Sequence, residues 1–423
     1  MRKRLGEKKG EKRGNLGFRI LVTDPECRAR AGLLRLKHGT IETPAFMPVA
    51  TKATVKTLSS EDMESLGAQI LMCNTYHLHL QPGEQVVKRL GGLHSFMDWK
   101  KPIITDSAGF QAFSLGYGIE HFTGKIGSYF IGDDELGRKK GHVAKKLAHV
   151  DEEGVRFNSI YNNEVRHLTP EKSIAIQKAL GADIIIAFDE CTSPYSDHDY
   201  TKQSMERTHR WAERSLKAHK RNRKHQSLFG VIQGGYYEDL RRESARFISS
   251  LSFDGICVGG SLGRSKDDMH RILDWVHEEI SGSKGSSVRP VHLLGIGTVE
   301  DIFESVQRGI DLFDCVGPTR IARCGYVYIT PKSGGTKKNK FRFKITNSKF
   351  ENDRVPIDKT CSCPVCKRHS RSYIRHLFKS REYLAYRLTT IHNLHFMLQL
   401  MEDIRESIRI GKFLQLKKKW LGR

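Results

Sequence analysis

The stretch TPEKSIAIQKALGADIIIAF, residues 169–188, carries the signals of one helix followed by those of one strand. Thr169 can cap a helix, Pro170 takes its first position and Gly181 can end it. The run at 183–188 is rich in isoleucine, as in a parallel strand that is buried on both faces. The stretch therefore predicts a helix that leads into a strand of a buried parallel sheet.

The same alternation of helix and strand signals recurs along the chain. Residues 298–308 read as a short helix with acidic residues at its start, ending at Gly309. Eight strand-like runs occur at 43–49, 70–76, 103–106, 183–188, 228–232, 255–258, 291–295 and 312–316. Eight strand-helix units over about 300 residues predict an α/β fold, an irregular (β/α)8 barrel with insertions. A doubly wound open sheet is the alternative.

Three segments fall outside the regular alternation and suggest how the chain is divided. Residues 1–14 are basic and are predicted to be a disordered arm. The barrel is expected over 15–332, with a glycine- and lysine-rich insertion at 116–146 and then a hairpin that turns at 162–163. Residues 333–423 are expected to form a zinc-binding subdomain and C-terminal helices.

The charge balance favours a polyanionic partner. The chain has 71 Lys and Arg against 48 Asp and Glu, a net charge of +23, which suits contacts with the phosphates of nucleic acid. A merely solvated basic surface is the alternative. No apolar run is long enough to span a membrane and the basic start lacks the apolar core of a signal peptide, so no membrane partner and a cytoplasmic location are expected.

Three of the nine cysteines crowd into six residues as Cys361-x-Cys363-x-x-Cys366. Three thiolates in one short loop suit tetrahedral zinc rather than a disulfide framework, and a reduced loop without metal is the alternative. Chain proximity alone favours His369 as the fourth ligand. The candidates from the sequence are Cys324, His369, His376, His392 and His395.

Asp106, Asp189 and Asp314 each stand at or just after the end of a predicted strand. In a barrel these ends lie on one face, so the three carboxylates would converge. One nucleophilic carboxylate and one that shuttles a proton are what displacement at an anomeric carbon needs, and a third can read a purine edge. The alternative for each aspartate is a helix cap or turn residue.

Five segments together indicate a family. The chain resembles the tRNA-guanine transglycosylases over residues 16–416. The similar segments are DSAGFQAFSL (106–115), FDECT (188–192), GVIQGG (230–235), GIGTVEDIFESVQRGIDLFDCVGPTRIAR (295–323) and CSCPVCKRHSRSYIRHL (361–377).

The resemblance implies a double displacement in queuosine tRNA modification. Guanine at the anticodon wobble position of tRNA would be replaced by a 7-deazaguanine, the prequeuosine base, with Asp314 as nucleophile and Asp106 as general acid and base. Alternatives are the same chemistry with queuine as the incoming base, a non-catalytic RNA-binding accessory subunit, or a glycosidase-like barrel for a small nucleoside.

The resemblance also implies supporting residues. Those that would bind the purine or support Asp106 are Asn74, Ser107, Phe110, Asp189, Gln233 and the backbone at Gly260. Arg320 and Arg323 would hold the uridines that flank the target base. His392 would complete one structural zinc site with the three cysteines. Tyr373 and His376 match positions at the family's homodimer interface.

One loop departs from the bacterial pattern of the family. Residues 259–264 read GGSLGR, one residue shorter than the usual loop and without its valine and acid. Loss of the valine would make room for the cyclopentenediol of queuine. Loss of the acid would weaken selection for the aminomethyl cation of the prequeuosine base. Ala108, Gly317 and His369 are further departures.

Overall fold

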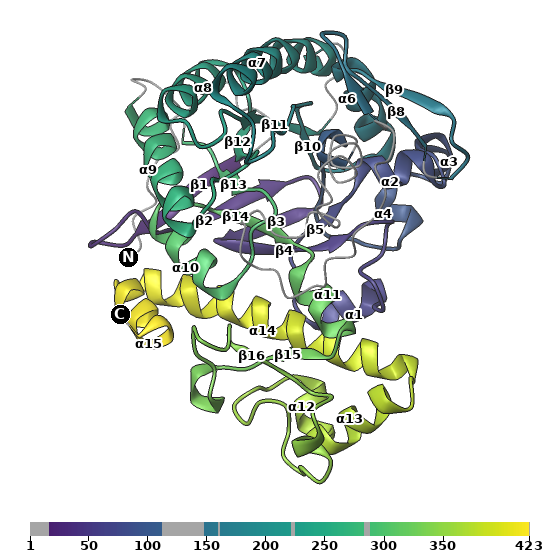
Figure 1. Cartoon of the computed structure of the whole chain (residues 1–423), viewed down its shortest axis with the longest axis vertical. Helices are drawn as coiled ribbons and strands as arrows, with labels where there is room; N and C mark the ends of the chain where they lie inside the picture. Colours follow the sequence, from purple (N-terminus) through teal and green to yellow (C-terminus); the bar gives the residue numbers. More distant parts are fainter. Residues whose placement is uncertain (1–16, 112–147, 160, 221–224, 283–287, 423) are drawn as a thin grey trace, which may run out of the picture.

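The computed structural model describes residues 17–111, 148–159, 161–220, 225–282 and 288–422. The predicted arm at 1–14 and insertion at 116–146 lie outside these residues. At the centre is a closed barrel of eight parallel strands in the order β10-β11-β12-β13-β14-β4-β5-β6 (Figure 1). Its strands are β4 (Ala45–Ala50), β5 (Leu71–Cys73), β6 (Ile103–Thr105), β10 (Ile184–Ile186), β11 (Ser227–Ile232), β12 (Gly255–Val258), β13 (Val291–Leu293) and β14 (Leu312–Cys315).

The predicted (β/α)8 barrel is therefore confirmed, and closure excludes the open sheet. All eight predicted strands are present, although six of the predicted runs extend past the observed strands, and two of these overlap a neighbouring element. Thr43 belongs to an antiparallel strand rather than to the barrel. The second predicted strand ran into a helix: the Asn74 side chain accepts a hydrogen bond from the His77 amide (3.1 Å), so a helix begins at Thr75.

Helices surround the barrel. They are α1 (Ser60–Ser65), α2 (Thr75–Leu80), α3 (Glu84–Arg89), α4 (Leu93–Phe96), α6 (Pro170–Leu180), α7 (His198–Lys220), α8 (Glu238–Ser250), α9 (Lys266–Gly282) and α10 (Val299–Gln307). The caps of α6 are as predicted, with Thr169 at its start and Gly181 in the left-handed conformation (φ 81°) at its end. Thr298 caps α10 in the same way as Thr169 caps α6.

Alternate residues of each strand divide the core into two parts. One face of the strands fills the barrel, through side chains such as Met47, Phe229 and Cys257, and the other face packs under the helices. Leu34 and Ile41 join the cluster inside the barrel although they belong to a separate antiparallel sheet. The sequence reading missed this sheet, made of β1 (Gly17–Thr23), β2 (Arg30–Leu36) and β3 (Gly39–Thr43).

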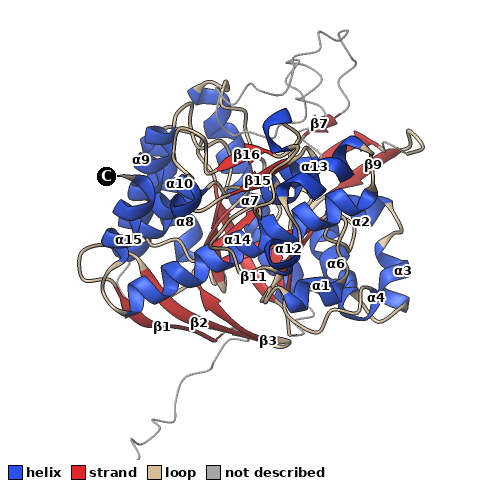
Figure 2. Cartoon of the chain, turned by 90° about the horizontal axis from the view of Figure 1, so that it is seen from below, coloured by secondary structure: helices blue, strands red, loops and turns tan. Residues whose placement is uncertain are grey.

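This antiparallel sheet closes the N-terminal end of the barrel; Figure 2 shows it along one edge of the molecule. His38, between β2 and β3, bonds through Nδ1 to Asp183 (2.7 Å), which directly precedes β10. Gly39 lies against Pro102, which directly precedes β6. The opposite end, where the strands terminate, is the face at which barrels of this kind carry their active sites.

A second antiparallel sheet confirms the predicted hairpin. Its strands are β7 (Ala148–Val150), β8 (Val155–Asn158) and β9 (Val165–Leu168). The turn between β8 and β9 contains Asn162 and Asn163, and Asn163 takes the left-handed conformation (φ 56°) that asparagine tolerates.

The C-terminal part contains α11 (Gly317–Arg323), β15 (Tyr326–Tyr328), η1 (Pro331–Ser333), β16 (Arg342–Lys344), η2 (Ser348–Phe350), α12 (Pro364–Arg368), α13 (Arg371–Lys379), α14 (Tyr383–Arg409) and α15 (Phe413–Leu421). The long helix α14 runs between the barrel and the small unit of β15, β16, α12 and α13 (Figure 1). Arg405 on α14 donates to the Pro44 carbonyl beside β4 (2.9 Å). None of the helices in the described part of the chain has both the length and the hydropathy of a membrane span.

Candidate active site

Asp106 directly follows β6, and hydrogen bonds fix its carboxyl group. Asn74, the cap of α2, donates through Nδ2 to Oδ2 (2.5 Å), and the Thr75 amide donates to Oδ1 (2.8 Å). Burial raises the pKa of Asp106 to about 7, and the charge of Asp314 adds to the rise, against hydrogen bonds from the Thr75 and Ala108 amides. A carboxyl with a pKa near neutrality can both give and take a proton.

Asp189 follows β10 and lies in a cluster of buried polar side chains with Ser107 and Gln233, called the polar pocket here. Ser107 donates to its Oδ1 (2.8 Å) and Gln233 donates to its Oδ2 (2.7 Å). Burial raises the pKa of Asp189 to about 6, although both hydrogen bonds lower it. Ser107 was expected to support Asp106, but its hydroxyl bonds to Asp189 instead. Because Asp106 and Ser107 are consecutive, the backbone still links the two carboxyl groups.

Gln233 and Gly260 belong to the same polar pocket. Oε1 of Gln233 is buried and has no hydrogen-bond partner within the described residues, so it is an acceptor that a ligand can satisfy. Gly260 has a φ of 76°, and a Cβ at this position would lie 2.1 Å from Gln233 Oε1. Glycine at 260 therefore lets the backbone come close to the amide of Gln233.

Asp314, near the end of β14, has a different environment. Its Oδ1 accepts hydrogen bonds from His292 Nε2 (2.9 Å) and from the Gly295 amide (3.0 Å). Its side chain is 14% exposed. The carboxylate is thus held by one oxygen in the mouth of the barrel, close enough to Asp106 to raise the pKa of that group.

Arg241 on α8 connects two turns of the polar pocket. It was not predicted as a site residue from the sequence. Its guanidinium is fully buried and donates to the carbonyls of Ile232 (3.0 Å), Gly235 (2.6 Å), Gly259 (2.9 Å) and Ser261 (2.8 Å). Burial lowers the pKa of Arg241 to about 9. The arginine therefore ties the turn after β11 to the turn after β12, which contains Gly260.

The other expected residues lie near the barrel mouth on adjoining elements. Phe110 is partly buried and follows Asp106 by four residues. Arg320 and Arg323 are on α11, the helix that directly follows β14 and Asp314. Arg323 donates to the Thr319 carbonyl within its own helix (2.7 Å). Both arginines are partly exposed.

Cys361, Cys363, Cys366 and His392 form a group whose ligand atoms all lie within 4.8 Å of one another. The three sulfurs are 3.8, 3.6 and 3.3 Å from His392 Nδ1. Zinc with Zn–S bonds of about 2.3 Å and tetrahedral geometry needs ligand atoms roughly 3.5–4 Å apart. His392 Nε2 donates to the Tyr328 carbonyl (2.8 Å), which leaves Nδ1 free of a proton and able to bind metal. The group fits a zinc site, and His369, which stacks on Tyr373, is outside it.

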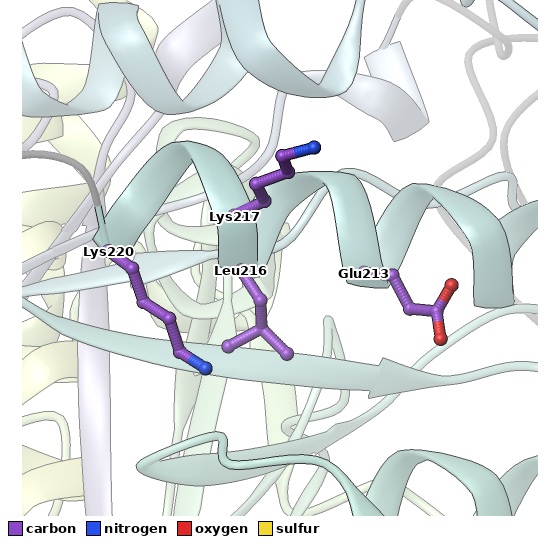
Figure 3. Close-up of a pocket in the computed structure, with 4 residues that line it drawn as sticks. All are labelled: Glu213, Leu216, Lys217 and Lys220. Carbon is purple, nitrogen blue, oxygen red and sulfur yellow. The ribbon is translucent and has the colours of Figure 1, made fainter.

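A hollow elsewhere on the surface is unrelated to these residues. Glu213, Leu216, Lys217 and Lys220 line it, and all four come from α7 (Figure 3). Its charged side chains spread apart rather than converge on one point (Figure 3). Strand-end residues are not part of its lining, so the barrel mouth is the better candidate for catalysis.

The barrel, its two neighbouring carboxyl groups and the Cys3His group define a class: a barrel enzyme equipped for displacement at a glycosidic carbon, with a fitted zinc site. The sequence pattern of the family described as queuine tRNA-ribosyltransferase matches residues 24–423. The chain belongs to this family, and it is accordingly a glycosyltransferase of the pentosyltransferase class.

Relatives match along nearly their whole length. A protein of Archaeoglobus fulgidus is 50% identical, over 96% of this chain and 99% of its own. A queuine tRNA-ribosyltransferase of Roseiflexus sp. is 43% identical over the same shares. One of Thermoanaerobacter sp. is 44% identical over 95% of this chain and 96% of its own.

Proposed function

We propose that this chain exchanges guanine at the wobble position of a tRNA anticodon for a 7-deazaguanine, the prequeuosine base, in queuosine modification. The family match supports the base exchange. The observation that carries the mechanism is the pair of carboxyl groups at the barrel mouth. Asp106 has a pKa raised to about 7, and Asp314 is anchored through one oxygen.

In the first half of the reaction, Asp314 attacks the anomeric carbon of the target guanosine. Among the described residues, both hydrogen bonds to this carboxylate go to Oδ1, which leaves Oδ2 as the attacking oxygen. The bond from Oδ2 to C1′ forms as the bond from C1′ to guanine N9 breaks. Asp106 gives its proton to the departing guanine and becomes a carboxylate.

The second half reverses these steps with the new base. The incoming 7-deazaguanine attacks C1′ through its ring nitrogen and the ester to Asp314 breaks. Asp106 takes the proton from that nitrogen. Both carboxyl groups return to their starting states, so no further reactant is required.

The buried pocket supports recognition of the purine. The Asp189 carboxylate can accept hydrogen bonds from the ring and amino N–H groups of guanine, and Gln233 Oε1 and the backbone at Gly260 offer further partners. Phe110 would stack on the base. A guanine that enters this pocket must leave the anticodon stack, which is how enzymes reach a glycosidic bond in RNA.

The C-terminal part would hold the tRNA. Arg320 and Arg323 would contact the nucleotides that flank the target. One structural zinc would occupy the group of Cys361, Cys363, Cys366 and His392; its chemistry is to cross-link the cysteine loop to α14.

Queuine is a second candidate for the incoming base, favoured by the loop at 259–264. This loop contains no carboxylate, and Arg264 lies over the ring of Tyr236 at 5.2 Å and donates to its hydroxyl (3.3 Å). A cationic aminomethyl group gains no charge partner from such a loop. Guanine release from tRNA, measured by mass spectrometry with queuine and with the prequeuosine base, separates the two candidates by their relative rates.

We also propose a homodimer that uses α13. Tyr373 on this helix is 39% exposed, and Tyr383 at the start of α14 is 87% exposed. Exposed aromatic side chains on two adjoining helices suit a partner surface. Light scattering should give the mass of a dimer, and Tyr373→Arg should shift the mass toward that of a monomer.

The nucleophile is tested with Asp314→Ala and Asp314→Asn. Both variants should lose guanine exchange and the tRNA adduct that resists denaturing electrophoresis. The asparagine variant is the matched control, because its side-chain oxygen can still accept from His292 and Gly295 while it cannot form the ester. Exchange retained by either variant at a wild-type rate would exclude Asp314 as nucleophile.

A further inference from the structure

His292 is an ionisable side chain inside the barrel, where the strands otherwise place mainly apolar residues. It lies in the middle of β13, is fully buried, and pairs in register with Cys257 of β12 and Leu312 of β14. Its strand neighbours Val291 and Leu293 belong to the cluster on the other face of the sheet. A buried imidazole is costly unless both ring nitrogens find partners.

Both nitrogens of this ring do have partners. Nε2 lies 2.9 Å from Asp314 Oδ1, and Nδ1 lies 3.7 Å from the sulfur of Cys257. Cys257 is also fully buried, and burial raises the pKa of its thiol well above the ordinary value. The thiol therefore keeps its proton and can donate a hydrogen bond to Nδ1.

This arrangement decides which ring nitrogen carries the proton. Because the carboxylate of Asp314 can only accept, the neutral ring carries its proton on Nε2 and donates to Asp314, and its unprotonated Nδ1 accepts from the Cys257 thiol. The Gly295 amide donates to the same oxygen from another direction (3.0 Å). Two donors on Oδ1 fix the rotation of the carboxylate and leave Oδ2 to react.

We propose that His292 is a positioning residue for Asp314, held in its donating tautomer by Cys257. The inference rests on the proposed role of Asp314 as nucleophile. The ring orients Oδ2 for attack on C1′. It also stabilises the carboxylate when the ester breaks in the second half of the reaction, because negative charge then returns to Asp314.

The test measures single-turnover formation of the tRNA adduct at saturating tRNA. His292→Leu removes the donor and should slow adduct formation by about tenfold to a hundredfold, the range that loss of one positioning contact gives. His292→Gln can place an amide N–H near the position of Nε2 and should recover most of the rate. Cys257→Ala should slow adduct formation less than His292→Leu does. It removes the partner of Nδ1, so the ring can adopt either tautomer, but the ring itself remains.

A purely structural role would give a different pattern. Val291→Ala is the matched control, since it truncates a buried side chain on the same strand but on the opposite face. It should lower Tm without slowing adduct formation at a temperature well below Tm. The binding constant for tRNA and the zinc content should be unchanged in all of these variants.

Three results would overturn the proposal: folded His292→Leu forms adduct at a wild-type rate, His292→Gln is no faster than His292→Leu, or Val291→Ala is slowed equally. If His292→Leu does not fold, the glutamine variant with Cys257→Ala decides the same question. Failure of the proposed function is distinguishable, because Asp314→Ala would then still form adduct whatever the His292 variants do.

Discussion

The two halves of the exchange should depend on pH in opposite directions. The pKa of Asp106 is raised to about 7, first by burial and then by the charge of Asp314. In the proposed mechanism the free enzyme carries the proton on Asp106, which then protonates the departing guanine. With a pKa of about 7, roughly half of the enzyme is protonated at pH 7, and the fraction falls about tenfold for each further pH unit. We therefore expect kcat/KM for tRNA to be level below pH 7 and to fall above it.

The proposed covalent intermediate should show the opposite dependence on pH. Its Asp314 is an ester without charge, so the Coulombic contribution that raises the pKa of Asp106 is gone and this pKa falls below about 7. Asp106 must now be ionised to accept a proton from the incoming base. We expect kcat/KM for the base to rise with pH in the acidic range and to level off above the lowered pKa of Asp106.

The assay follows incorporation of labelled guanine into tRNA between about pH 5 and 9, with each substrate varied in turn. Tm measured over the same range shows whether unfolding contributes to either limb. Asp106→Asn should lose exchange, and any residual activity should show neither limb. If kcat/KM for tRNA rose through neutrality, or if the two limbs had the same sign, Asp106 would not be the group that shuttles the proton.

Three further predictions concern the pocket and the metal. Gly260→Ala should lower kcat/KM for guanine at least about tenfold, because its Cβ would meet the pocket amide at 2.1 Å; Gly334→Ala, also at positive φ but with open space around it, shows the effect of backbone strain alone. His392→Ala should reduce bound zinc, measured by elemental analysis, whereas His369→Ala should retain it; equal zinc in both would contradict the ligand set. Arg241→Met should lower the free energy of unfolding in urea by about 3 kcal/mol, because four buried carbonyls lose their donor; a change near zero would show that water replaces the guanidinium.

The barrel could be predicted because its signals are local. In residues 169–188 the cap at Thr169, the stop at Gly181 and the isoleucine run act within a few residues of one another, and the structure places α6 and β10 there. The sheet that closes the barrel could not be predicted in this way. In the sequence, Leu34 and Ile41 look like ordinary apolar residues of a hairpin. Only the tertiary fold shows that they pack into the end of the barrel interior.

In the candidate site, too, some residues could be predicted from local sequence signals and others only from the tertiary fold. Asp106, Asp189 and Asp314 could be named because barrel closure brings all strand ends to one face. Arg241 and His292 could not be named as pocket residues, because neither is at a strand end. A signal for His292 does exist in hindsight: it is an ionisable residue in the middle of an apolar strand, and its register with Cys257 follows only from the order of the strands in the barrel.

The proposed fourth zinc ligand shows why proximity in the chain is a poor guide to a metal site. His369 directly follows α12, but it turns away to stack on Tyr373. His392 comes from α14, and the next residue, Asn393, donates to the carbonyls of Pro318 in α11 (3.1 Å) and Tyr326 in β15 (3.0 Å). Two consecutive residues of one helix thus hold the cysteine loop and the helix that carries Arg320 and Arg323. A metal that fixes α14 also fixes those arginines, so its loss should weaken binding of tRNA before it disturbs the carboxyl groups at the barrel mouth.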